Sequence, residues 1–270
     1  MEKVIFNKFD SVEQFSNWLQ STPQTAKGKE FNASNEISRS NTKFAGTESF
    51  EEAQNLLKCG DKENADKIAA TIRKIKAQGK GTETRNKLYN SPCGFMPIVP
   101  KVLAGDPQNM LAIKKQTYQS TKVLNVVYNT TVHGSVKKEN ILNVAAKIAN
   151  VIASLEKNGY RINLYVFFAA KDCYKGKTEA SCLIKVKDSG KYLDTLRIAY
   201  PLVNSSFLRR HLFAYLERLP EYVLEYNYGY VAGDDNAQKY IPLQKYSYLS
   251  YYICSGKTEE EIAKYIENAK

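Results

Sequence analysis

The chain has 270 residues, of which 43% are hydrophobic and 25% are charged. This composition excludes disorder throughout and allows one sizeable core, or one core with a small accessory lobe, since domains usually run ~100–200 residues. The formal net charge is +11 with only two histidines. Contact with phosphate or another acidic surface is therefore an open expectation, and histidine chemistry has few places to occur.

The sequence favours a cytoplasmic protein that does not insert in a membrane. No stretch approaches the ~20 apolar residues of a membrane helix, and the first residues lack the layout of a signal peptide. The cysteines are odd in number and never spaced as CxxC, which argues against a disulfide framework and a zinc site. They are Cys59, Cys93, Cys173, Cys182 and Cys254. The cysteines therefore favour reduced, packed thiols, and we expect no cofactor.

The first part of the chain, residues 1–46, is predicted to form one helix followed by a polar loop. Val12, Phe15, Trp18 and Leu19 recur at helical spacing between Asp10 and Gln20. Residues 21–47 are rich in Ser, Thr, Asn and Lys and have no period, which is typical of a loop or flexible connection.

Residues 47–110 are predicted to form a helical hairpin and a structured loop. Ser49 and Glu52 match a capping box for a helix from Phe50, Gly60 can end it, and Asp61 can cap a second helix to about Gln78. Four prolines and two glycines between residues 87 and 110 then forbid long regular elements. The apolar residues of this loop are too many for a solvated tether, so we expect it to pack along the main core.

Residues 111–270 alternate between strands and helices and are predicted to form an α/β domain. The expected strands are residues 123–128, 161–169, 181–186, 226–231 and 246–254, with helices at 138–157, near 193 and 206, and from 258. Helices of this length between strands imply a mainly parallel, Rossmann-like sheet flanked by helices on both faces. The alternating strand 181–186 is a candidate antiparallel edge strand.

Several segments resemble an uncharacterised family encoded by tailed phages and integrated elements. They read SFEEAQNLLKCGD, CGFMPIVPKVLAGDPQNM, LEKNGYRINLYVFF and FLRRHLFAYLE, and the resemblance covers the chain from about Thr47 onward. Members of that family look like distant von Willebrand A (vWA) domains, with a first strand, a long helix ending in Leu-Glu-x-x-Gly, and a second strand. The resemblance therefore implies a vWA-like domain, whose first strand normally ends in the Mg²⁺-binding motif D-x-S-x-S.

The place equivalent to this motif carries Asn129, Thr131 and His133, so an asparagine replaces the carboxylate. Hard cations are held mainly by anionic oxygen, so the resemblance implies a degenerate site without a working metal. Asp234 and Asp235 follow a later strand, where loops gather at the carboxyl ends of a parallel sheet, and could contribute carboxylates. A turn that hydrogen-bonds its own backbone is the favoured explanation of these two residues.

Other candidate chemistries have weaker support. His211 is expected to be a partly buried packing residue on a helix, and no phosphate loop, dinucleotide fingerprint or HExxH motif occurs. The turn at Gly105, Asp106 and Pro107 needs only a structural role. The late tyrosines, from Tyr222 to Tyr252, could stack bases, but half-buried strands favour tyrosine anyway.

The sequence therefore favours a non-catalytic phage or mobile-element protein that binds a protein partner through its degenerate site loops. The alternative is a nucleic-acid-binding protein that uses basic and tyrosine-rich surfaces. A metal-dependent hydrolase or nuclease that uses Asp234 and Asp235 is a third hypothesis. The oligomeric state, the identity of the partner and any association with the virion stay open.

Overall fold

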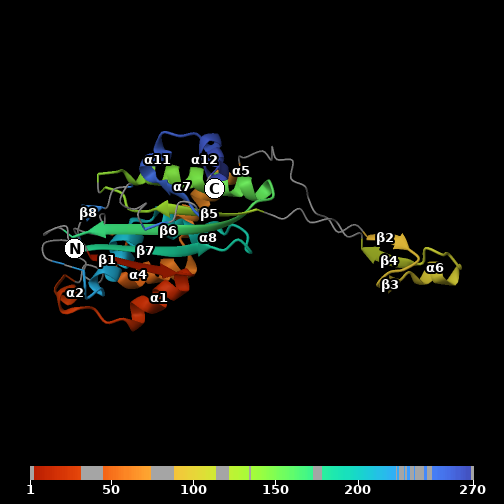
Figure 1. Cartoon of the computed structure of the whole chain (residues 1–270), viewed down its shortest axis with the longest axis horizontal. Helices are drawn as coiled ribbons and strands as arrows, with labels where there is room; N and C mark the ends of the chain where they lie inside the picture. Colours follow the sequence, from red (N-terminus) through yellow and green to blue (C-terminus); the bar gives the residue numbers. More distant parts are fainter. Residues whose placement is uncertain are drawn as a thin grey trace.

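The computed structural model describes residues 3–31, 45–73, 88–113, 122–133, 135–172, 178–222, 224, 228, 230–231, 234, 240–241 and 245–268. Its main sheet has the strand order β1-β7-β6-β5-β9, and a short strand β8 pairs with β6 (Figure 1). These strands are β1 (Lys3–Phe9), β5 (Val123–Asn129), β6 (Arg161–Lys171), β7 (Thr178–Lys187), β8 (Tyr230–Val231) and β9 (Ser247–Ser250). The predicted α/β fold with a mostly parallel sheet flanked by helices is confirmed.

The position of β7 in the sheet differs from the prediction that it is an edge strand. β5 pairs in parallel with both β6 and β9, whereas β7 is antiparallel to β6, as its alternating pattern indicated. However, β7 is not an edge strand, because β1 pairs with it in parallel along its length. The N-terminal segment is therefore part of the main sheet rather than a helical region that precedes it.

Ten described helices accompany the sheet. They are α1 (Val12–Ser21), α2 (Ala26–Phe31), α4 (Phe50–Cys59), α5 (Lys62–Arg73), α7 (Lys138–Lys157), α8 (Thr195–Val203), the π-helix η2 (Phe207–Leu212), α9 (Phe213–Glu217), α11 (Tyr251–Ser255) and α12 (Glu259–Asn268). The longest, α7, has the predicted bounds and buries a wide face that includes Ile148, Ile152 and Leu155. This helix connects the parallel strands β5 and β6, so its apolar face packs on the sheet.

The two faces of the sheet are covered differently. The larger core combines one face of the strands with buried residues from α1, α4, α5, α7, α8, α9 and α12. Side chains alternate along a strand, so the smaller core, which includes Val127, Tyr165 and Phe167, lies on the opposite face. There the strands are joined by Ile241 and by the partly buried Tyr240 and Tyr246. Ile253 of the helix α11 (Tyr251–Ser255) also packs against this smaller core, so among the described residues a helix contributes to each face, but far less to this one.

The helical hairpin of residues 50–73 is confirmed, with its caps. The backbone N–H of Glu52 donates to Ser49 Oγ over 2.9 Å, and that of Asn64 donates to Asp61 Oδ1 over 3.1 Å. Gly60 ends α4 with φ of 91°, a left-handed value that favours glycine. The helix α5 is described as far as Arg73, and Gln78 lies outside the described residues.

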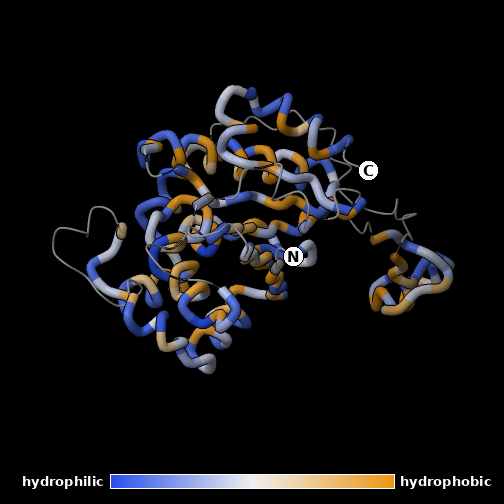
Figure 2. The backbone as a smooth tube through the Cα atoms, turned by 60° about the vertical axis from the view of Figure 1, so that its left-hand side comes forward, coloured by the Kyte–Doolittle hydropathy of each residue, from blue (hydrophilic) through white to orange (hydrophobic). Residues whose placement is uncertain are grey.

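Residues 88–113 form a small separate unit, which we call the sheet unit. It contains β2 (Leu88–Ser91), β3 (Met96–Pro97), α6 (Val99–Leu103) and β4 (Met110–Ile113), with the antiparallel order β2-β4-β3. Figures 1 and 2 both show it apart from the main layer. The prediction that this segment packs along the main core is wrong, because none of its residues joins either core.

Backbone hydrogen bonds close the sheet unit on itself. The N–H of Phe95 donates to Leu111 O over 2.9 Å, and the N–H of Ile98 donates to Asn109 O over 2.7 Å. At the turn that follows α6, Gly105 has φ of 70° and Asp106 Oδ1 accepts from the N–H of Gln108 over 2.8 Å. The structural role predicted for this turn is confirmed.

Two other segments correct the predicted elements. The strand predicted to run to Cys254 ends at Ser250, because the Ser250 hydroxyl accepts from the N–H of Ile253 and starts α11. The polar segment after Gln20 contains α2 before residues 32–44, which lie outside the described residues. Of the strand predicted for residues 226–231, the structure describes β8 only. None of the described helices has the length and apolar character needed to cross a membrane.

Candidate functional site

The candidate site lies where two neighbouring parallel strands end. β5 and β9 run side by side, and their register places Asn129 directly opposite Ser250. The carboxyl ends of parallel strands, together with the loops that follow them, are the usual place for a site in an α/β sheet. Asn129 and Ser250 are both buried there, so polar partners must be supplied by the protein itself.

Those partners converge on Asp234. Tyr248 Oη donates to Asp234 Oδ1 over 2.8 Å, and Ser250 Oγ donates to Asp234 Oδ2 over 2.7 Å. Asn129 Nδ2 donates to Tyr248 Oη over 2.8 Å and lies 3.4 Å from Asp234 Oδ1. We call these four residues the Asp234 network. The structure thus brings together Asn129 and Asp234, two predicted site residues that are far apart in the sequence.

Tyr248 is a protonated donor in this network. Burial raises the pKa of Tyr248 far above its usual value, and the adjacent Asp234 carboxylate raises this pKa further. The phenol therefore stays protonated and remains a donor to the carboxylate. Hydrogen bonds to a charged acceptor are the stronger kind, so the network should hold the loop after β5 in one arrangement.

The remaining predicted loop residues do not face a common metal position. The Asn129 side-chain carbonyl accepts from the N–H of Thr131 over 2.9 Å, which closes a tight turn. The Thr131 hydroxyl accepts from the N–H of Ala169 over 3.5 Å, so it points toward β6. His133 is exposed, and its Nδ1 lies 2.8 Å from Ser135 Oγ. His133 is therefore at the rim, outside the Asp234 network.

The carboxylate chemistry of the site is limited. Both oxygens of Asp234 already accept hydrogen bonds from hydroxyl groups of the chain. Among the described residues, no group of three His, Cys, Asp or Glu side chains is placed to hold a metal ion. Asp235 lies outside the described residues.

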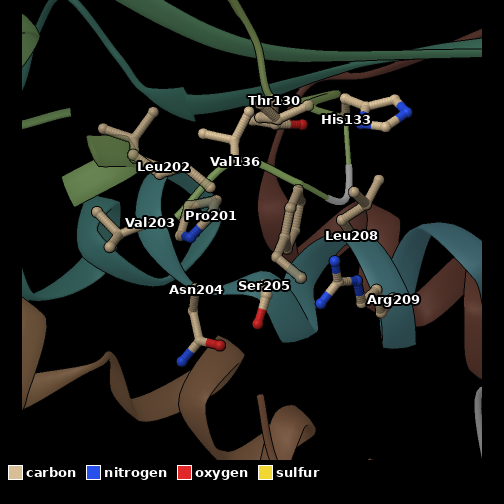
Figure 3. Close-up of a pocket in the computed structure, with 13 residues that line it drawn as sticks. Thr130, His133, Val136, Pro201, Leu202, Val203, Asn204, Ser205, Leu208 and Arg209 are labelled. Carbon is tan, nitrogen blue, oxygen red and sulfur yellow. The ribbon is translucent and has the colours of Figure 1, made fainter. Parts of the chain in front are cut away.

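A small cavity lies under the loop that follows β5 (Figure 3). Its volume is about 40 Å³, and most of its wall is apolar, with Val136, Pro201 and Leu208 beside the more polar Asn204 and Arg209. Sites for small molecules and cofactors usually have ~300–1,000 Å³. This cavity therefore suits one small side chain of a partner better than a cofactor.

The second histidine has a structural role. His211 is fully buried, and its Nδ1 lies 2.9 Å from Tyr200 Oη. Burial, with a smaller contribution from the neighbouring Arg210, lowers the pKa of His211 to about 3. The imidazole is therefore neutral at ordinary pH and sealed from solvent, which confirms the prediction of a packing residue.

Most of the late tyrosines that the structure describes are packing residues as well. Tyr222 and Tyr248 are buried, and Tyr228 stacks on Phe213 with ring centroids 4.0 Å apart. Tyr230 and Tyr252 are half or more exposed. The tyrosines therefore form no continuous stacking platform among the described residues, and Tyr226 lies outside them.

Two of the site residues, Tyr248 and Ser250, are not among those predicted from the sequence. Both lie on a predicted strand, but nothing in the sequence indicates that this strand pairs with β5. The signal that could have found them is the order of the strands. A strand added next to β5 would bring its last residues to the same edge of the sheet.

Comparison with known proteins identifies a family without an assigned function. Residues 1–269 match the family described as "Domain of unknown function (DUF7192)", and the chain belongs to that family. No curated protein and no solved structure matches the chain. The family match includes β1, the sheet unit and α12, so all three are parts of one family architecture.

Proposed function

We propose that this chain is a non-catalytic protein-binding module of a tailed phage or integrated element. The binding surface would be the loops at the carboxyl edge of the main sheet, around Asn129, Thr131, His133 and Asp234. The observation that carries the proposal is the closed Asp234 network, in which both carboxylate oxygens accept from the chain's own hydroxyl groups.

A closed network favours binding over catalysis. A general base or metal ligand needs a lone pair directed at a substrate or ion, and the Asp234 oxygens are directed at Tyr248 and Ser250. The same hydrogen bonds hold the loop after β5 before any partner arrives. A preformed loop loses less conformational entropy on binding, which favours affinity for a protein surface.

The rim of the site supports the same proposal. The small apolar cavity could receive one apolar side chain, and Arg209 and His133 lie beside it (Figure 3). Anchors of this kind, an apolar group in a pocket beside a hydrogen-bonding group, commonly carry most of the energy of a protein interface.

A vWA-like relationship is consistent with the order of these elements. β5 is followed by α7, which ends in Leu155-Glu156-Lys157, and then by the parallel strand β6. Asn129 is the last residue of β5, the position at which the resemblance expects a carboxylate. In the proposal, the loss of this charge turns a cation-dependent binding edge into one that works without a cation.

The test is capture of a partner from cells that carry the phage or element, with two charge-matched variants. His133→Glu alters the rim, whereas Tyr192→Glu alters a residue that is 87% exposed after β7, at the opposite edge of the sheet. We expect the wild type and Tyr192→Glu to retain the same defined partner and His133→Glu to lose it. Binding of the purified partner should then be at least tenfold weaker for His133→Glu.

Absence of any defined partner, or equal loss in both variants, would contradict the proposal. Treatment of the extract with nuclease separates the nucleic-acid alternative, which rests on the net charge of +11. A partner lost after nuclease treatment was held through nucleic acid, and direct binding should then weaken steeply with salt.

A further inference from the structure

The sheet unit exposes apolar side chains on most of its elements. It contains half of the large hydrophobic side chains that are exposed in the described chain. These are Leu88, Tyr89, Phe95, Met96, Val99, Val102, Leu103 and Ile113. Patches of this kind on a small unit usually mark an interaction site. Figure 2 shows hydrophobic stretches along much of the unit.

The unit is also too small to be stable uncovered. Chains below ~40 residues usually need disulfides, metals or oligomerisation to fold. Cys93 in the unit is a free, exposed thiol. Among the described residues, the outer strands β2 and β3 each pair only with β4, so each has a sheet edge without a partner strand there. We therefore expect another protein surface to pack against the exposed apolar side chains and strand edges of this unit.

The charge of the unit limits which surfaces can pack against it. Its only charged side chains, Lys101 and Asp106, form an ion pair over 3.2 Å. The net charge of +11 therefore lies entirely outside the unit. Two copies of the chain would repel each other elsewhere, but they can meet at the sheet unit without that cost.

The main layer offers no matching apolar surface among its described residues. Only Val4 and Phe6, which share one face of the edge strand β1, are paired among the exposed large hydrophobic residues of its described part, and the others, such as Tyr192 after β7, lie on separate elements. The surface most like the sheet unit is the same unit on another molecule. An apolar surface without net charge can pack against a second copy of itself, and a two-fold axis closes such an interface.

We infer that the sheet unit is a self-association surface, through which two copies of this chain form a dimer. The inference is independent of the proposed function, because it uses residues 88–113 and not the carboxyl edge of the main sheet. Exposed β2 edges of two copies could also pair across the two-fold axis, which would satisfy their free backbone groups.

The first test is the mass of the purified full chain in solution over a range of concentrations. We expect the wild type to have twice the mass of one chain, and Leu103→Glu, at a position 83% exposed, to dissociate at least tenfold more readily. Tyr192→Glu, at a position 87% exposed on the main layer, should behave as the wild type. A monomeric wild type, or a Leu103→Glu protein that dimerises as tightly as the wild type, would overturn the inference.

A second test locates the interface without altering its apolar residues. A nitroxide on Cys93, in a chain with Cys59→Ser and Cys173→Ser, should give an intermolecular distance within the range of electron-electron double resonance. Mixing labelled with excess unlabelled chain should remove this signal. A dimer whose Cys93 labels give no intermolecular distance would place the contact elsewhere and would contradict the inference.

Discussion

At the carboxyl edge of the main sheet, polar side chains are buried and bonded to one another, whereas in the sheet unit apolar side chains are exposed. Asp234 accepts from Tyr248 and Ser250, and all these groups belong to one chain. The apolar side chains of Phe95 and Leu103 are instead exposed to solvent. The first region is complete within a single molecule, but the second is not. Changes in the two regions should therefore have different consequences, which the following experiments measure.

The largest difference is expected from one substitution made in both regions. Leu164 is fully buried in β6, so Leu164→Ala should lower the free energy of unfolding by about 3 kcal/mol, because it leaves a cavity. Leu103→Ala in the sheet unit should change the free energy of unfolding of the main layer by less than ~0.5 kcal/mol. Urea unfolding of both variants, followed by far-UV circular dichroism, measures the two values. Similar losses would show that the unit and the layer fold as one.

Acid should destabilise the main layer through His211. Burial lowers the pKa of His211 to about 3 in the folded protein, against an ordinary value near 6.5. The unfolded chain therefore binds a proton first, and the stability contributed by the neutral imidazole is lost as the pH falls from about 6.5 toward 3. At pH 4.5 the loss should be about 2–3 kcal/mol.

Urea unfolding at a series of pH values checks this dependence. The control is His211→Gln, which has no titratable group and keeps a partner for the Tyr200 hydroxyl. This variant should lose much less stability between pH 6.5 and 4.5 than the wild type does. Parallel pH curves for the two proteins would show that His211 is not the group responsible.

The Asp234 network should contribute a smaller amount. Asp234→Ala removes the acceptor of the Tyr248 and Ser250 hydroxyls, so we expect a loss of about 2 kcal/mol in unfolding free energy. Asp106→Ala is the matched control, because Asp106 makes similar hydrogen bonds within the sheet unit. That control should leave the main layer within ~0.5 kcal/mol of the wild type. A loss of the same size in both variants would remove the contrast between the two regions.

Parts of the fold were predictable because local signals agreed with tertiary packing. The bounds of α7 followed from a 3.6-residue period over 20 residues, and α4 followed from the Ser49 cap. β1 was missed although Val4, Ile5, Phe6 and Phe9 favour a strand, because its pairing with β7 is a long-range contact. The strand predicted through Cys254 was too long, because only the structure shows that Ser250 caps α11.

The candidate site was predictable only in part, for a related reason. Asn129 could be placed at the carboxyl edge of the sheet because it ends β5. Asp234 was expected there after a parallel strand, but β8 is antiparallel to β6 and pairs only with its last residues, Ala170 and Lys171, among the residues described. The network partners Tyr248 and Ser250 depend on the pairing of β9 with β5, which is a long-range contact. The sheet unit was wrongly predicted to pack on the main core. Its apolar composition indicates that its surface is covered, but not whether the same chain or another chain covers it. Composition cannot distinguish a core within one chain from an interface between two chains.

The smallest expected effect tests the vWA-like alignment of the Asp234 network. Asn129→Asp would place a second carboxylate next to Asp234 Oδ1, in place of an amide nitrogen 3.4 Å away. The like charges should destabilise the protein, and Mg²⁺ should bind between them. At a concentration of Mg²⁺ ten times its dissociation constant, the variant should regain about 1.4 kcal/mol. Calorimetry and thermal unfolding with and without Mg²⁺ measure this gain.

The control for this prediction is Asn125→Asp on the same strand. Asn125 donates to Lys245 O, away from Asp234, so this variant should show no response to Mg²⁺. If Asn129→Asp also shows none, the end of β5 does not correspond to the metal-binding end of a vWA domain. The closed network would then be a structural cap of the sheet, and the binding surface would have to be sought elsewhere, with the sheet unit as the next candidate.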